Sequence, residues 1–149
     1  MSKSSVRATI SGQAVLVAEL LQLALEPVLQ SEGISVSTFD MLTAVQSGAG
    51  TASQAQIAAI LRVSAPTLSE AVKAAVDKGL LLQIDDPNDR RAKILDLTPR
   101  GASIIERAMK EIEAAETVID SVMGPDEKDR TLAVLQKTVR ALAQHLNTP

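Results

Sequence analysis

The chain has 149 residues, of which 46% are hydrophobic; Phe39 is the only aromatic residue, His145 the only histidine, and cysteine is absent. This length suits one domain with a packed core and is short for a multidomain enzyme. The lack of cysteine excludes disulfides and thiol chemistry, and the net charge of −3 gives no overall attraction to nucleic acid, so any DNA binding must come from a local surface.

The first predicted element is a helix over residues 10–30, which is rich in Leu, Val and Ala at helical spacing and ends at residues 31–33. We expect no secretory signal before it. We also expect no apolar run long enough to span a bilayer, because charges and glutamines interrupt each one. The sequence therefore predicts a cytoplasmic protein that does not engage membranes.

A second helix is predicted to follow, with Ser37 as its cap and Phe39, Leu42 and Val45 on its inner face. The small residues 47–50 end this helix. The aromatic ring of Phe39 is assigned to the hydrophobic core.

Two short helices come next. Ser53 and Gln56 have the spacing of a capping box, which opens the first of them. Ser64 can cap the second, and Pro66 is tolerated in its first turn because no intrahelical donor is lost there. The connection over residues 61–64 is tight, so the pair is a helix-turn-helix candidate. The expected inward-facing residues are Ile57, Ala58, Ile60 and Leu61 in the first helix and Leu68, Val72, Ala75 and Val76 in the second.

A β-hairpin is predicted directly after the second short helix. Residues 80–84 form a short apolar run, residues 85–91 a polar turn, and residues 93–97 an alternating strand. A hairpin in this position is called a wing.

The last two predicted elements are long helices. The first starts at Pro99 and ends at the Gly124-Pro125 break, after which Asp126 can cap the second. Both carry apolar residues at alternating spacings of three and four, which is typical of helices that pack against a partner. These seams consist of Ile105, Ala108, Ile112, Ala115, Ile119 and Val122, and of Leu132, Leu135, Val139, Leu142 and Leu146.

Residues 89–98, Asp-Arg-Arg-Ala-Lys-Ile-Leu-Asp-Leu-Thr, resemble the wing signature of the MarR family of regulators. Pro99-Arg100-Gly101 resembles the entry into the dimer helix of that family, and residues 64–67 resemble the start of its recognition helix. With the helix order on either side, the resemblance covers nearly the whole chain, residues 1–149, as a single MarR-like domain.

The resemblance implies a mainly α fold with a small β-hairpin wing. Residues 35–98 would form the winged helix-turn-helix, and residues 8–32 and 99–149 the long terminal helices of a dimerisation domain. The resemblance also implies a homodimer that binds double-stranded DNA at a pseudo-palindromic operator. The helix over residues 64–78 would enter the major groove, and the wing around Arg90 and Arg91 would reach the backbone or the minor groove.

The residues assigned to this interface either hold its shape or contact DNA. Asp89 is expected to hold the shape of the wing, because a carboxylate would repel phosphate. Ser53 and Ser64 can serve equally as helix caps and as phosphate contacts. The expected DNA-binding residues are Ser53, Ser64, Ala65, Pro66, Thr67, Ser69, Glu70, Lys73, Arg90, Arg91 and Lys93.

The sequence thus predicts a sequence-specific transcriptional regulator, a repressor that responds to a small molecule. The resemblance suggests an apolar or aromatic acid as this effector. The alternative is a winged-helix dimer that serves as a protein-interaction module, because six acidic and six basic residues cancel between residues 52 and 98. We expect no cofactor, metal site or enzymatic activity, since the sequence shows no nucleophile paired with a base, no metal-ligand cluster and no phosphate loop.

Overall fold

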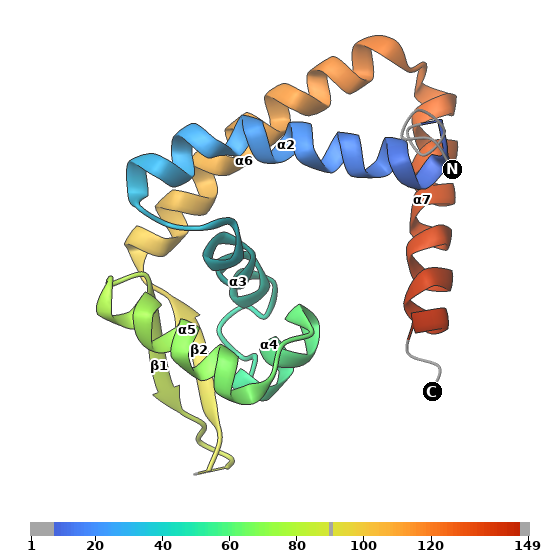
Figure 1. Cartoon of the computed structure of the whole chain (residues 1–149). Helices are drawn as coiled ribbons and strands as arrows, with labels where there is room; N and C mark the ends of the chain where they lie inside the picture. Colours follow the sequence, from blue (N-terminus) through green and yellow to red (C-terminus); the bar gives the residue numbers. More distant parts are fainter. Residues whose placement is uncertain (1–7, 90, 147–149) are drawn as a thin grey trace. The chain divides into compact units, whose positions relative to one another are not determined.

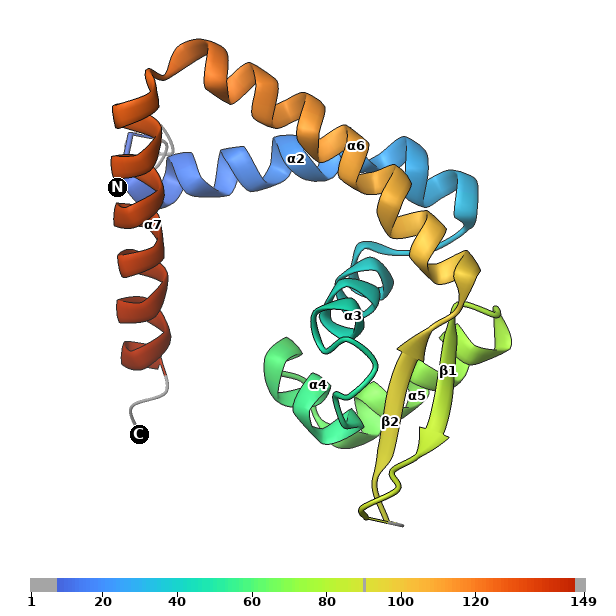
Figure 2. The same cartoon turned by 180° about the vertical axis from the view of Figure 1, so that it is seen from behind.

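The computed structural model describes residues 8–89 and 91–146 (Figures 1 and 2). The described residues form two compact units, which meet between Ile112 and Glu113 in the sequence. The predicted mainly helical fold with one hairpin is confirmed. The described elements are α2 (Ile10–Glu32), α3 (Val36–Ser47), α4 (Gln54–Leu61), α5 (Ala65–Asp77), β1 (Leu81–Asp85), β2 (Lys93–Leu97), α6 (Pro99–Val122) and α7 (Pro125–Leu146).

Thr9 caps the start of α2, where its side chain accepts a hydrogen bond from the Gly12 N–H at 3.0 Å, and Gly33 caps the end in the left-handed conformation. Most of its apolar side chains are exposed. Contrary to expectation, α2 is long and apolar enough to cross a membrane, with a mean hydropathy of 1.4 in its most apolar window. The expectation was wrong because Glu19 and Glu26 are too few charges to lower the hydropathy of this helix below that of a membrane span. Length and composition alone also fit a helix that another protein chain covers.

Helices α3, α4 and α5 surround the core of the first unit, in which Leu42, Ile57 and Val72 are almost completely buried. Ser35 caps α3 in place of the predicted Ser37, because the helix begins one residue after Ser35 and the Thr38 N–H reaches the Ser35 hydroxyl. The predicted capping box at Ser53 and the cap at Ser64 are both confirmed.

Two side chains assigned to the inner faces of these helices lie outside the core. Ile60 of α4 is 60% exposed and Val76 of α5 is 37% exposed. Each lies at the edge of its apolar stripe. Because α4 spans only about two turns and packs on α3 and α5, its buried side chains are Ile57 and Ala58, in the middle of the helix.

Strands β1 and β2 form the predicted antiparallel hairpin, which lies beside α5 (Figures 1 and 2). Leu81 pairs with Leu97, and Gln83 pairs with Leu95. Strand β1 begins one residue later than predicted, because the Leu80 N–H donates to the Ala75 carbonyl of α5 at 2.9 Å and so still belongs to the end of that helix. Leu81 and Leu95 are buried, so one face of the hairpin closes the core.

The first turn of α6 packs directly against the chain before β1. The Thr98 hydroxyl accepts the Gly101 N–H at 3.0 Å and donates to the Gly79 carbonyl at 2.7 Å. A Cβ atom on Gly101 would lie only 2.2 Å from the Leu80 carbonyl oxygen. Thr98 therefore caps α6, and Gly101 permits a backbone approach that a side chain would prevent.

The second unit contains the end of α6 and all of α7. The break at Gly124 is confirmed, but Asp126 lies in the first turn of α7 and does not cap it, because the Glu127 and Lys128 N–H groups donate to the Gly124 carbonyl. A carboxylate in this turn is still favourable to the helix dipole. Hydrogen bonding to Asp120 raises the pKa of Lys128. Helix α7 has no buried residue.

Candidate nucleic-acid interface

The turn between α4 and α5 exposes the leading end of α5. The Ser64 hydroxyl accepts the Thr67 N–H at 3.2 Å and lies 2.7 Å from the Thr67 hydroxyl. Ala65 and Pro66 complete this first turn, and all four residues are exposed. Small polar groups at the solvent-facing start of a recognition helix are placed as base readers usually are.

The solvent-facing side of α5 continues from this turn. Ser69, Glu70 and Lys73 are exposed, whereas Leu68 and Val72 are buried on the opposite side. Glu70 lies one turn before Lys73, so the two charges largely cancel in their attraction for phosphate. The exposed residues border a groove of about 320 Å³ that reaches β1, lined by Ser69, Glu70, Val72, Lys73, Val76 and Gln83.

Ser53 lies where α4 approaches the hairpin. Its hydroxyl accepts the Gln56 N–H at 3.2 Å, and its backbone forms an isolated bridge with Ile94 of β2. Next to it, the Gln54 side chain accepts a hydrogen bond from the Gln83 amide at 2.8 Å. Gln54 and Gln83, which link α4 to β1, were not predicted from the sequence.

The tip of the hairpin is a hydrogen-bonded turn organised by two aspartates. The Asp86 carboxylate accepts the Asn88 N–H at 2.8 Å, and the Asp89 carboxylate accepts the Arg91 N–H at 2.9 Å. The Asp89 carbonyl also accepts the Ala92 N–H at 2.9 Å. The carboxylate of Asp89 thus contacts backbone in the described part of the turn.

Some basic side chains of the winged region form ion pairs or hydrogen bonds with neighbouring groups, and others do not. Lys93 forms an ion pair with Asp85, and Lys78 donates to the Gly33 carbonyl at 2.7 Å. Arg90 lies outside the described residues. The exposed residues Arg62, Lys73 and Arg91 form no ion pair with any residue that the structure describes.

Arg62 was not assigned to the interface from the sequence, although it is the only basic residue in the turn between α4 and α5. It is the C-cap of α4, with φ 55° and ψ 40° in the left-handed region. Its N–H donates to the Ala59 carbonyl at 3.3 Å. The signal available in the sequence was its place in the tight connection between the two helices.

A polar junction joins the ends of α2 and α5 to the start of α6. Glu32, largely shielded from solvent, forms ion pairs with Arg100 and Arg107, and the hydrogen bond from Arg107 lowers the pKa of this carboxyl. Arg100 also donates to the Lys78 carbonyl at 2.9 Å. The recognition helix is thereby fixed to the two long helices at its C-terminal end.

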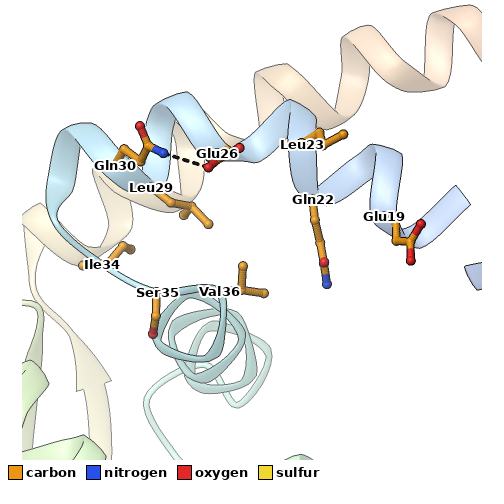
Figure 3. Close-up of a pocket in the computed structure, with 9 residues that line it drawn as sticks. All are labelled: Glu19, Gln22, Leu23, Glu26, Leu29, Gln30, Ile34, Ser35 and Val36. Carbon is orange, nitrogen blue, oxygen red and sulfur yellow. Dashed lines mark hydrogen bonds between the residues drawn. The ribbon is translucent and has the colours of Figure 1, made fainter. Parts of the chain in front are cut away.

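Figure 3 shows a second hollow, a cavity of about 580 Å³ between α2 and the start of α3. Leu29, Ile34 and Val36 supply apolar surface. Glu19 and Glu26 supply carboxylates, and Gln30 donates to Glu26 at 2.8 Å. Among the residues that the structure describes, none of those lining this cavity is basic.

Within the described ranges no three His, Asp or Glu side chains gather as metal ligands do. His145 lies exposed in the last turn of α7.

Part of the chain matches the model of a known protein family. The model of the MarR family matches residues 32–92. A protein of Thauera aromatica, named as a transcriptional regulatory protein for the hcr operon, is 23% identical over 110 residues. The match covers 74% of this chain and 66% of that protein, slightly less than two thirds of its length.

Two solved structures share the fold. The MepR–DNA complex of S. aureus has a TM-score of 0.75 and 23% identity, covering 90% of this chain and 96% of that one. The transcriptional repressor CouR, bound to a DNA duplex, has a TM-score of 0.73 and 20% identity, covering 93% and 98%. At these identities the likeness concerns the fold.

Proposed function

We propose that this chain, a member of the MarR family, is a sequence-specific DNA-binding transcriptional regulator that acts as a homodimeric repressor. The observation that carries the proposal is the exposed start of α5, flanked by a hairpin whose turn is held by Asp89. The similarly folded MepR and CouR are both described in complex with DNA. The family and fold are those of transcriptional regulators, so we propose no enzymatic activity and a cytoplasmic location.

In this proposal α5 enters the major groove, where Thr67 and Ser69 meet base edges, while Arg90 and Arg91 reach the backbone or minor groove. Lys93 contributes less than its charge suggests, because Asp85 offsets it. Residues 8–32 and 99–149 supply the dimer interface, which is supported by the exposed apolar residues of α2 and α7. We do not favour the alternative interaction module without DNA binding, whose only support is the cancelling charge of the winged region.

Identifying the operator tests the proposed function directly. A two-fold symmetric dimer should protect an inverted repeat with half-sites about one helical turn apart. Footprinting on DNA selected from a random pool would reveal it. The Ser69→Ala variant should discriminate operator from scrambled DNA less well, because a lost base contact costs about 1–3 kcal/mol on the cognate site alone. Failure to enrich any sequence, at any salt concentration, would contradict the proposal.

The effector is proposed to bind in the cavity between α2 and α3. The family resemblance suggested an apolar or aromatic acid, but Glu19 and Glu26 would repel a carboxylate, and no basic residue in the described part of the lining would pair with it. The lining supports a cation with a large apolar group. In this proposal, binding there changes how α2 packs on α3, which carries part of the core of the winged region.

Tetraphenylphosphonium and tetraphenylborate test this charge preference, since they match in size and shape but differ in sign. We expect the cation to bind more tightly in calorimetry and to release operator DNA. Glu19→Gln with Glu26→Gln should weaken its binding about tenfold or more, whereas Glu113→Gln, an exposed change on α6, should leave it unchanged. Tighter binding of the anion would overturn the assignment.

A further inference from the structure

The turn of the helix-turn-helix holds an arginine in an unfavourable backbone conformation. Arg62 has a positive φ, which residues with a Cβ adopt at an energetic cost and which glycine or asparagine usually supplies at the end of a helix. The described neighbours give its side chain no ion pair that would compensate. A strained residue without a structural partner is a reason to look for a functional one.

Arg62 also lies beside the surface expected to meet DNA. It precedes the Ser64 cap of α5 by two residues, and every residue from Arg62 to Thr67 is exposed. The guanidinium therefore belongs to the same surface as the first turn of the recognition helix. In helix-turn-helix complexes this end of the helix meets the base edges, and the phosphates lie at the margins of the groove.

Most other basic side chains in and around the winged region already interact with acidic or carbonyl groups, so few remain to contact a phosphate. Lys78 is held at the Gly33 carbonyl and Lys93 at Asp85, and Glu70 lies one turn from Lys73 on α5. The nearby Arg100 and Arg107 of α6 are held by Glu32. Among the described basic residues of α4, α5 and their turn, Arg62 is the one with no acidic residue within four positions in sequence.

We propose that Arg62 binds a backbone phosphate at the edge of the major groove and so sets the position of α5 against the bases. This inference rests on the proposed function and adds a contact to it. A guanidinium suits the role because it presents several N–H donors in a plane to phosphate oxygens. The contact would act on every DNA sequence alike, since phosphates carry no sequence information.

The Arg62→Gly variant separates this role from folding, because glycine adopts the left-handed conformation without the strain of a side chain. We expect an unchanged or higher thermal midpoint and an unchanged oligomeric state. Affinity near 0.1 M salt should fall about fivefold to tenfold for operator and scrambled duplex alike. The slope of log affinity against log salt should fall by about one, as the loss of one phosphate contact predicts.

Two further variants complete the experiment. Arg62→Lys keeps the charge and should retain the salt slope. Gln46→Glu shifts the net charge by the same amount at an exposed position of α3, outside the assigned DNA contacts and the dimer helices, and should leave the slope unchanged.

The outcomes distinguish this inference from the proposed function. If the wild-type protein binds no DNA, both fail. If it binds and Arg62→Gly keeps the wild-type slope and affinity, the phosphate contact alone is refuted. A loss confined to the operator, with the slope unchanged, would instead assign Arg62 to base reading and also overturn the phosphate assignment.

Discussion

Replacing Gly101 with alanine is expected to lower the free energy of unfolding by about 2–3 kcal/mol and the thermal midpoint by about 5–10 °C. The added Cβ would lie 2.2 Å from the Leu80 carbonyl oxygen, a backbone atom that cannot turn away. Relief of this contact requires α6 to move off the start of β1. That movement would weaken the hydrogen bonds that Thr98 makes to the Gly79 carbonyl and the Gly101 N–H.

Alanine is otherwise the better residue in a helix, by about 1 kcal/mol over glycine. A stabilised variant would therefore mean that α6 does not approach Leu80 this closely. Gly124→Ala is the matched control, because a Cβ there meets no atom within 4 Å and its φ is not in the left-handed region. Urea or thermal unfolding followed by circular dichroism measures both variants, and we expect Gly124→Ala to unfold close to the wild type.

The elements of the chain could be predicted because their ends are marked locally. Ser53 with Gln56, and Ser64 with Pro66, define helix starts through contacts within four residues. The bounds of β2 were predicted correctly from its alternation. The same reasoning missed the cap of α3, because Ser35 and Ser37 are both suitable and only the path of the chain after Gly33 decides between them.

Contacts between residues distant in the sequence could not be predicted in this way. Glu32 lies 75 residues before Arg107, and no local pattern indicates that they pair. The role of Gly101 likewise depends on Leu80, which is brought to α6 only by the completed hairpin. The exposure of Ile60 and Val76 is also a tertiary result, since periodicity assigns a side chain to a stripe but not to its buried centre.

For the candidate interface, the sequence indicated which residues to consider but not the state of their charges. Lys93 was counted as a contact because it is basic and lies in the wing, but Asp85, its partner across the hairpin, offsets its charge. Arg62 was passed over because the turn was judged only for its length. Its left-handed backbone became evident only with the φ angle.

Placing aspartate at two positions of the α7 seam, Leu135→Asp with Leu142→Asp, is expected to abolish the proposed dimer and with it operator binding. The seam side chains are between 46% and 71% exposed in the single chain, and α7 buries none of its residues. Such a helix needs a partner, and a second copy of the chain supplies a complementary seam by symmetry.

Each introduced carboxylate would be buried at the interface without a counter-ion, which costs on the order of 3–5 kcal/mol. The dissociation constant of the dimer should therefore rise by more than about 100-fold. Analytical ultracentrifugation at micromolar concentration should detect monomers. Ala133→Asp with Ala141→Asp is the matched control, because it adds the same charge away from the seam of Leu132, Leu135, Val139, Leu142 and Leu146 and should leave the dimer intact. A seam variant that sediments as the wild type does would show that α7 is covered in another way, and residues 99–149 would then lose their assignment to the interface.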